Sequence, residues 1–354
     1  MRKVVSFLLL ASLVTMVGCG SKTTPAETGA QPPAESPKTT GTAPAGNKLP
    51  KTMKFGTASP KDHPMSKGAF KFAELAEKET KGAIKVEVFT DGTLGGDVQM
   101  INSLKAGTLQ AASIASAPLA SSSKSMNLFE LPFLFKDEAS AYKVLDGEIG
   151  KQVLADLKNL NLIGLSYMEN GFRHLTTASK DIKTVADLKG LKIRTQESPI
   201  HLDTWKALGT TPTAIAFTEL FTALEQKVVD GQENPYTNIK FKNMYEVQKY
   251  LINTGHVYNV NPLIIGQKFW DTLTKEEQQA LQKAADEATK YQRELSQQEN
   301  KAAVQFLKDK GMIVHDMTPE AHKEFVDKLK PVYDKYRAEL GADLVDNLLN
   351  AAKN

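Results

Sequence analysis

Cysteine is almost absent from this sequence of 354 residues: Cys19 is the single one, so no disulfide can form within the chain. The six histidines show no spacing typical of zinc ligands, and neither a G-x-S-x-G elbow nor a P-loop ending in Lys-Ser/Thr occurs. We therefore expect no metal site, no cofactor and no catalytic nucleophile. The fold must be stabilised by a sizeable packed core.

A strong charge of either sign is also lacking, because 44 basic residues face 41 acidic ones and the formal net charge is +3. Binding of nucleic acid needs a concentrated basic face, so the composition argues against a nucleic-acid partner. Two carboxylate pairs, Glu219 with Glu225 and Asp230 with Glu233, are candidates for acid–base chemistry. We expect them instead to be solvated residues of a helix and a turn.

The N-terminal segment has the pattern of a secretion signal. A predominantly apolar run, residues 4–17, follows a basic start and is too short to span a bilayer comfortably. We interpret residues 1–18 as a signal peptide. The run ends in a sequence similar to a bacterial lipobox, which predicts cleavage before Cys19 and a lipid on that cysteine; an ordinary signal peptide is the alternative. The lipobox-like residues are Met16-Val17-Gly18-Cys19.

Residues 20–48 contain no large apolar side chain and are rich in Thr, Pro, Ala, Gly and Ser. Such a segment cannot bury enough surface to offset the entropy of ordering. We expect the lipidated cysteine and a disordered tether over residues 19–48. The protein is then extracytoplasmic, anchored by lipid to the cell membrane, in the periplasm or on the outer face.

Short apolar runs alternate with helical periodicity from residue 53 onward, which is typical of an α/β fold. The glycine-rich loop 92–97 lacks the dinucleotide and P-loop fingerprints, so we expect a tight turn with Asp97 as the N-cap of the next helix. The elements expected first are strands at 53–58, 85–89 and 111–115, and helices at 64–81 and 98–106.

A second α/β series is expected to begin near Leu162. Two such series predict two lobes, each a mostly parallel sheet flanked by helices, with a cleft between them. The expected elements are strands at 163–167, 191–194 and 213–217, and helices at 184–189, 199–208 and 219–229.

The C-terminal third begins with a capping box formed by Thr274 and Glu277. We expect one helix over about residues 274–310, roughly 50 Å long, which is more than one small lobe can cover. It should therefore brace both lobes. A strand at 312–315, a helix opened by Thr318 and a last amphipathic helix follow.

Several short motifs occur in a fixed order along the chain: Leu131-Pro132-Phe133-Leu134-Phe135, Gly171-Phe172-Arg173-His174, Gly190-Leu191-Lys192-Ile193-Arg194, Phe217-Thr218-Glu219, Val229-Asp230-Gly231-Gln232-Glu233-Asn234-Pro235 and Tyr245-Glu246-Val247-Gln248-Lys249. Together they resemble the extracytoplasmic substrate-binding proteins of TRAP transporters, in particular the dicarboxylate-binding, DctP-type branch. The resemblance extends from about residue 51 to the C-terminus.

This resemblance implies a two-lobed periplasmic-binding-protein-like fold. Lobe I is expected to contain residues 49–168 and 259–298, and lobe II residues 169–258 and 299–354. The resemblance also implies the site. Arg194 matches the arginine that pairs with the ligand carboxylate, Arg173 the second basic contact, Asn234 the asparagine bound to the same carboxylate, and Phe217 the aromatic residue beside it.

The expected function is capture of an organic acid anion, a C4-dicarboxylate or a sugar acid, by closure of the cleft. The implied partners are the small-molecule acid and the integral-membrane TRAP permease subunits that receive it. The protein is then not an enzyme. Two alternatives remain open: a sensor lipoprotein that presents its ligand to a membrane receptor, and a secreted enzyme that acts on acidic substrates.

Overall fold

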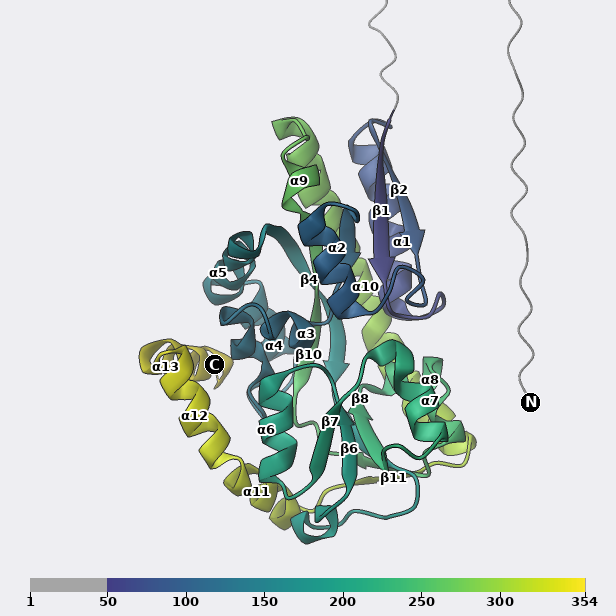
Figure 1. Ribbon diagram of the computed structural model, residues 1–354, viewed down its shortest axis with the longest axis vertical. Helices are drawn as coiled ribbons and strands as arrows, with labels where there is room; N and C mark the ends of the chain where they lie inside the picture. Colours follow the sequence, from purple (N-terminus) through teal and green to yellow (C-terminus); the bar gives the residue numbers. More distant parts are fainter. Residues whose placement is uncertain (1–49, 354) are drawn as a thin grey trace, which may run out of the picture. The chain divides into compact units, whose positions relative to one another are not determined.

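The computed structural model describes residues 50–353 (Figure 1). The expected signal peptide, the lipidated Cys19 and the tether lie outside the described residues. Within this range no helix is both long enough and apolar enough to cross a membrane.

The first sheet has five strands, in the spatial order β2 (Ile84–Phe89), β1 (Lys51–Thr57), β3 (Ala111–Ser113), β10 (Tyr258–Gly266) and β4 (Leu162–Phe172). β1 runs parallel to β2 and β3, whereas β10 runs antiparallel to β3 and β4. Residues 163–167, expected to open the second series, therefore belong to this sheet. Their partner strand lies about a hundred residues further along the chain, and nothing in the local pattern identifies it.

The second sheet has six strands, in the order β11 (Ile313–Asp316), β9 (Tyr250–Asn253), β5 (His174–Thr177), β8 (Gly231–Asn234), β6 (Lys192–Thr195) and β7 (Thr211–Ala214). β5 runs antiparallel to β8 and β9, and the other neighbours are parallel. A Cβ at Gly231 would lie 2.3 Å from the carbonyl oxygen of Thr176, so only glycine allows β8 to approach β5 here.

Helices surround both sheets. The α-helices are α1 (Pro64–Glu79), α2 (Asp97–Ala106), α3 (Ser116–Ala120), α4 (Glu138–Leu145), α5 (Glu148–Asp156), α6 (Pro199–Ala207), α7 (Leu220–Glu225), α8 (Tyr236–Phe241), α9 (Gln267–Trp270), α10 (Lys275–Asp309), α11 (Pro319–Lys328), α12 (Lys330–Leu340) and α13 (Ala342–Lys353). Short 3₁₀ helices include η1 (Ser125–Glu130), η2 (Leu157–Leu160), η3 (Val185–Leu188), η4 (Phe217–Glu219) and η5 (Met244–Glu246).

The expected long helix is α10, which has 35 residues and begins at the predicted capping box: the Thr274 hydroxyl accepts from the Glu277 N–H at 3.2 Å. α10 packs against α1 and β4 of the first half of the chain and against α8 and β11 of the second. Gln292 fixes it to β4, because its side-chain amide accepts from the N–H of Glu169 and donates to that residue's carbonyl oxygen. The prediction of a two-lobed fold braced by one helix is confirmed. The sheets were expected to be mostly parallel, but each contains parallel and antiparallel pairs.

The C-terminal helices also contact both halves: α12 packs on α6 and α13 packs on α4. The predicted assignment of residues 299–354 to lobe II, and the division into lobes as a whole, stay a prediction.

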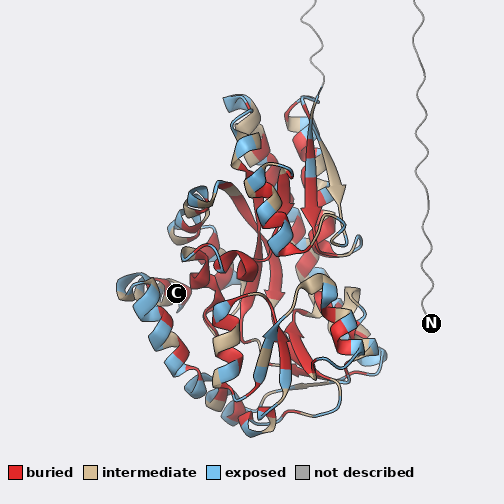
Figure 2. Ribbon diagram, viewed as in Figure 1, coloured by how far each residue is buried: buried red, intermediate tan, exposed pale blue. Residues whose placement is uncertain are grey.

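The inner strands of the two sheets are among the most deeply buried parts of the fold (Figure 2). All nine residues of β10 and all four of β8 are buried. Most of the core is aliphatic and aromatic, yet Arg173, Arg194, Glu130 and Glu233 are completely inaccessible to solvent. Burial of a charge is costly unless the charge is paired or binds a ligand, so each of these four side chains needs a partner inside the fold.

Candidate functional site

Residues from both sheets meet at a small cavity of about 20 Å³, room for about one water molecule. The side of the first sheet contributes Asp97 at the start of α2 and Asn261 on β10. The side of the second sheet contributes Asn234 on β8 and Phe217 in η4. The cavity is lined by Ala58, Ser59, Asp97, Ala115, Asn170, Gln196, Phe217, Asn234, Asn238 and Asn261.

Arg194 on β6 is fully buried, and its guanidinium is mostly unpaired. Its Nε donates to the carbonyl oxygen of Ile215 at 2.8 Å, while Nη1 and Nη2 have no hydrogen-bond partner. No carboxylate among residues 50–353 lies within 4.0 Å of it. Burial, together with the charge of Arg173, lowers the pKa of Arg194 to about 10, against the opposite effect of nearby carboxylates. At neutral pH it is a buried cation with four N–H groups free to donate.

Arg194 is not itself among the side chains that line the cavity. Asp97, which does line it, is one of the carboxylates that act on the Arg194 charge. The backbone that Arg194 holds through Ile215 leads within two residues to Phe217, which lines the cavity as well. These two links indicate that the guanidinium lies near this space without lining it.

Arg173 differs from Arg194, because it is already neutralised within the chain. Its Nε contacts Glu233 Oε2 at 2.5 Å, and Nη2 donates to Glu233 Oε1 at 2.9 Å. His256 Nε2 lies 3.1 Å from the same carboxylate. Burial alone would raise the pKa of Glu233, but the Arg173 charge and the hydrogen bonds of His256 and Arg173 hold it well below its usual value. The structure leaves only Nη1 of Arg173 without a partner.

The prediction that Glu233 is a solvated turn residue is therefore wrong. β8 pairs with β5 so that His174 opposes Asn234 and Leu175 opposes Glu233, which places the carboxylate beside Arg173 inside the fold. Glu219 and Glu225 are exposed, as expected.

Asn234 belongs to a chain of side-chain amides. Its Nδ2 donates to Gln232 Oε1 at 2.5 Å, and its Oδ1 accepts from Asn238 Nδ2 at 2.9 Å. Asn238 Nδ2 also reaches Asn170 Oδ1 at 3.2 Å. This network fixes the orientation of amides that line the cavity. Phe217 is half-buried at the same place, and the Lys242 ammonium lies 5.4 Å from its ring centroid.

Asp97 was expected as an N-cap, but the structure gives it a different place. Gly96 is the N-cap of α2, and its N–H donates to the side chain of Gln99 at 2.8 Å. Asp97 lies one residue later and accepts a hydrogen bond from the Ala115 N–H at 3.2 Å. Burial, with the nearby charge of Glu197, raises the pKa of Asp97 to about 7.

The side chain of His174 is not among those that line the cavity. It stacks on Tyr236 with ring centroids 4.2 Å apart, and its Nδ1 accepts from the Gly255 N–H at 3.2 Å. Burial lowers the pKa of His174 to about 3, so the ring is neutral.

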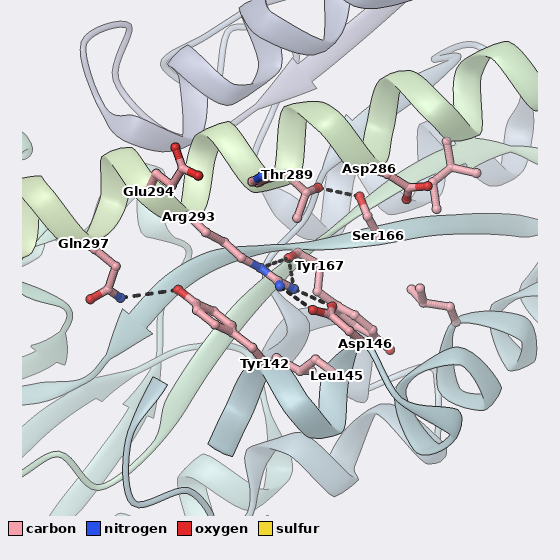
Figure 3. Close-up of a pocket in the computed structure, with 13 residues that line it drawn as sticks. Tyr142, Leu145, Asp146, Ser166, Tyr167, Asp286, Thr289, Arg293, Glu294 and Gln297 are labelled. Carbon is pink, nitrogen blue, oxygen red and sulfur yellow. Dashed lines mark hydrogen bonds and ion pairs between the residues drawn. The ribbon is translucent and has the colours of Figure 1, made fainter. Parts of the chain in front are cut away.

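A larger cavity of about 560 Å³ lies elsewhere, beside α10 (Figure 3). The arginine that lines it is already paired: Arg293 forms two hydrogen bonds with Asp146, at 2.6 and 2.8 Å, and stacks on Tyr142. None of the four predicted site residues lines it. In the part of the chain that the structure describes, no cluster of three or more His, Cys, Asp or Glu side chains could hold a metal ion.

Comparison with known proteins identifies the family. The family described as bacterial extracellular solute-binding protein, family 7, matches residues 55–339. The chain belongs to this family. It is a family of extracytoplasmic binding proteins and not of enzymes.

Relatives with assigned ligands are similar over most of their length. The 2,3-diketo-L-gulonate-binding periplasmic protein YiaO of Escherichia coli is 37% identical over 83% of this chain and 90% of its own. The C4-dicarboxylate-binding periplasmic protein DctP of Rhodobacter capsulatus is 36% identical over 84% of this chain and 89% of its own.

Solved structures match as well. The sugar acid binding protein DctPAm of Advenella mimigardefordensis, in complex with galactonate, superimposes with a TM-score of 0.84 at 38% identity, covering 86% of this chain and 98% of that one. A TRAP periplasmic solute-binding protein of Polaromonas sp. JS666, bound to D-erythronate, gives a TM-score of 0.82 at 36% identity, covering 84% and 98%.

The sequence did not identify Asp97, Asn170, Gln196, Asn238 or Asn261 as site residues. Pairing between strands that are distant in sequence, such as β4 with β10, brings these residues together, and such pairing leaves no local sequence pattern. Only Asn170, directly before the predicted Arg173 motif, carried a positional hint.

Proposed function

We propose that this protein captures an organic acid between its two sheets and delivers it to a TRAP-type secondary transporter. The observation that carries the proposal is the buried Arg194, whose Nη1 and Nη2 have no partner within the chain. A planar guanidinium can bind both oxygens of a carboxylate at once, through charge-assisted hydrogen bonds worth about 1.5–3 kcal/mol each. The related galactonate- and erythronate-binding proteins support an acid as the ligand.

Asn234 and Phe217 would complete the carboxylate end of the site, because both line the cavity near which Arg194 is buried. Arg173 would act chiefly by holding Glu233 and β8 in place, with Nη1 as its free donor. A cavity of about 20 Å³ does not admit a molecule of several carbons. The solute would therefore enter an open form, and its contacts with both halves would shift the population toward the closed one.

The loaded form would then dock on integral-membrane permease subunits. A lipid on Cys19 would keep the protein at the outer face of the cell membrane, with residues 19–48 as the tether. In cells, we expect wild-type protein in the membrane fraction, and a Cys19→Ala variant released from it. Equal membrane association of the two would argue against the lipid anchor.

Ligand capture is tested by thermal unfolding against a panel of organic acids, after the protein has been refolded from urea to remove any bound solute. An acid present at a hundred times its dissociation constant stabilises the protein by about 2.7 kcal/mol. We expect at least one acid to raise the melting temperature and its uncharged amide to have no effect. If no acid in the panel shifts the transition, the proposed function is wrong.

A further inference from the structure

The hydrogen-bonding groups left over at the cavity fall into two kinds. The donors are Nη1 and Nη2 of Arg194 and Nη1 of Arg173, which are buried near the cavity without lining it. The acceptors are Gln196 Oε1 and Asn261 Oδ1, which are buried and receive no hydrogen bond. The carboxyl group of Asp97, whose pKa is about 7, is ionised above that pH and is then a third acceptor, which receives a single hydrogen bond, from Ala115. One end of the site therefore needs an acceptor, and the other needs donors.

A carboxylate at neutral pH has only acceptors, whereas a hydroxyl both donates and accepts. One carboxylate is enough to satisfy the free edge of Arg194. A second carboxylate would place acceptors against Gln196, Asn261 and Asp97, and each buried acceptor without a donor costs about 1–3 kcal/mol. Hydroxyl groups would satisfy all three.

The charges around the cavity also favour a ligand with a single carboxylate. Arg194 is a buried cation without a counter-ion, whereas Arg173 is neutralised by Glu233. Lys242 is the other cation near the cavity; it is half-buried beside Phe217, and the charge of Asp91 already acts on it. A second negative charge on the ligand would also meet the charges of Asp97 and Glu197, which both act on Arg194. The site is built to hold one negative charge.

We propose that the ligand is a polyhydroxylated monocarboxylate, a sugar acid with an open or cyclic chain, in preference to a C4-dicarboxylate, and that Asp97 selects it by accepting hydrogen bonds from its hydroxyl groups. This inference rests on the proposed function and narrows it. Ser59, Asn170 and Asn238, which also line the cavity, offer further polar groups to the same hydroxyls.

The test is titration calorimetry of the refolded protein at pH 8, where Asp97 is ionised. Four probes are used: gluconate and erythronate, which carry one carboxylate and several hydroxyls; succinate, which carries two carboxylates; and hexanoate, which carries one carboxylate and no hydroxyl. We expect a sugar acid to bind at least about tenfold more tightly than succinate or hexanoate, because one charge-assisted hydrogen bond is worth about that factor or more.

Asp97→Asn isolates the proposed selector, because the asparagine keeps an oxygen that can accept from Ala115 but loses the charge. We expect it to weaken sugar-acid binding about tenfold and to leave succinate binding unchanged or stronger. Asp62→Asn removes the same charge from an exposed position outside the cavity and should leave all four affinities unchanged.

The outcomes separate the two proposals. If succinate binds as tightly as the sugar acids, or if Asp97→Asn affects all acids equally, the preference for hydroxylated monocarboxylates is refuted while acid capture stands. If none of the probes and no other acid binds, both proposals fail.

Discussion

The buried carboxyl group of Asp97 should make the stability of the ligand-free protein depend on pH. Its pKa rises from 3.8 to about 7 in the folded state. Between these values the folded protein keeps a proton that the unfolded chain has lost, so the free energy of unfolding falls as pH rises. Below about pH 4 both states are protonated and the effect vanishes; above about pH 7 both are ionised and the full cost is present.

The magnitude follows from the shift of about three pKa units, each worth about 1.4 kcal/mol. Asp97→Asn, which cannot ionise, should therefore be more stable than wild type by about 4 kcal/mol at pH 8 and by under about 1 kcal/mol at pH 4. The difference at pH 8 has this size because the charged carboxylate is buried away from water.

Urea unfolding measured between pH 4 and pH 8 gives this difference directly, and Asp62→Asn serves as the control because its side chain is exposed. Other groups, such as Glu233, titrate in both proteins, so their contributions cancel when the free energy of unfolding of wild type is subtracted from that of the variant. A difference between Asp97→Asn and wild type that stays constant across this range would refute the reasoning, as would lower stability of the variant at pH 8.

Two further substitutions test the framework around the site. Glu233→Gln should lower the free energy of unfolding by about 3–5 kcal/mol, because Arg173 would remain buried without its counter-ion; a loss under about 1 kcal/mol in urea unfolding would show that the pair is not buried as described. Thr274→Ala removes the oxygen that caps α10 and should cost about 1 kcal/mol, whereas Thr274→Ser should cost little; equal losses in the two variants would contradict the capping role.

Much of the fold could be predicted because its signals are local. The capping box at Thr274 and the absence of glycine and proline from the following residues predicted α10, and the alternation of apolar residues predicted β1, α1 and β2. The break between α11 and α12 falls at Leu329, two residues before Pro331.

What could not be predicted depends on pairing between distant strands. Glu233 is 60 residues from Arg173 in sequence, and only the register of β5 against β8 brings the two together. The same holds for residues 163–167, which pair with β10 in the first sheet. Asp97 was misplaced as an N-cap because the cap lies one residue earlier, at Gly96, a difference that composition does not resolve.

Only part of the site could be predicted, because its residues also come from elements that are distant in sequence. Asn234 and Phe217 line one cavity, and Arg194 is buried without lining it, but the roles of all three were implied by motifs and stay predictions. Gln196 and Asn261 are single amides without a motif. Only the structure shows that their oxygens lack donors.

The account depends most on Arg194 as the anchor of the ligand's carboxylate. Titration calorimetry of the tightest-binding acid should show a loss of affinity of about a hundredfold or more for Arg194→Met, since about 3–5 kcal/mol is lost when a buried charge loses its partner. Arg337→Met, which removes an arginine from an exposed pair with Asp346, should bind like wild type. Binding by a folded Arg194→Met variant within about threefold of wild type would contradict the account.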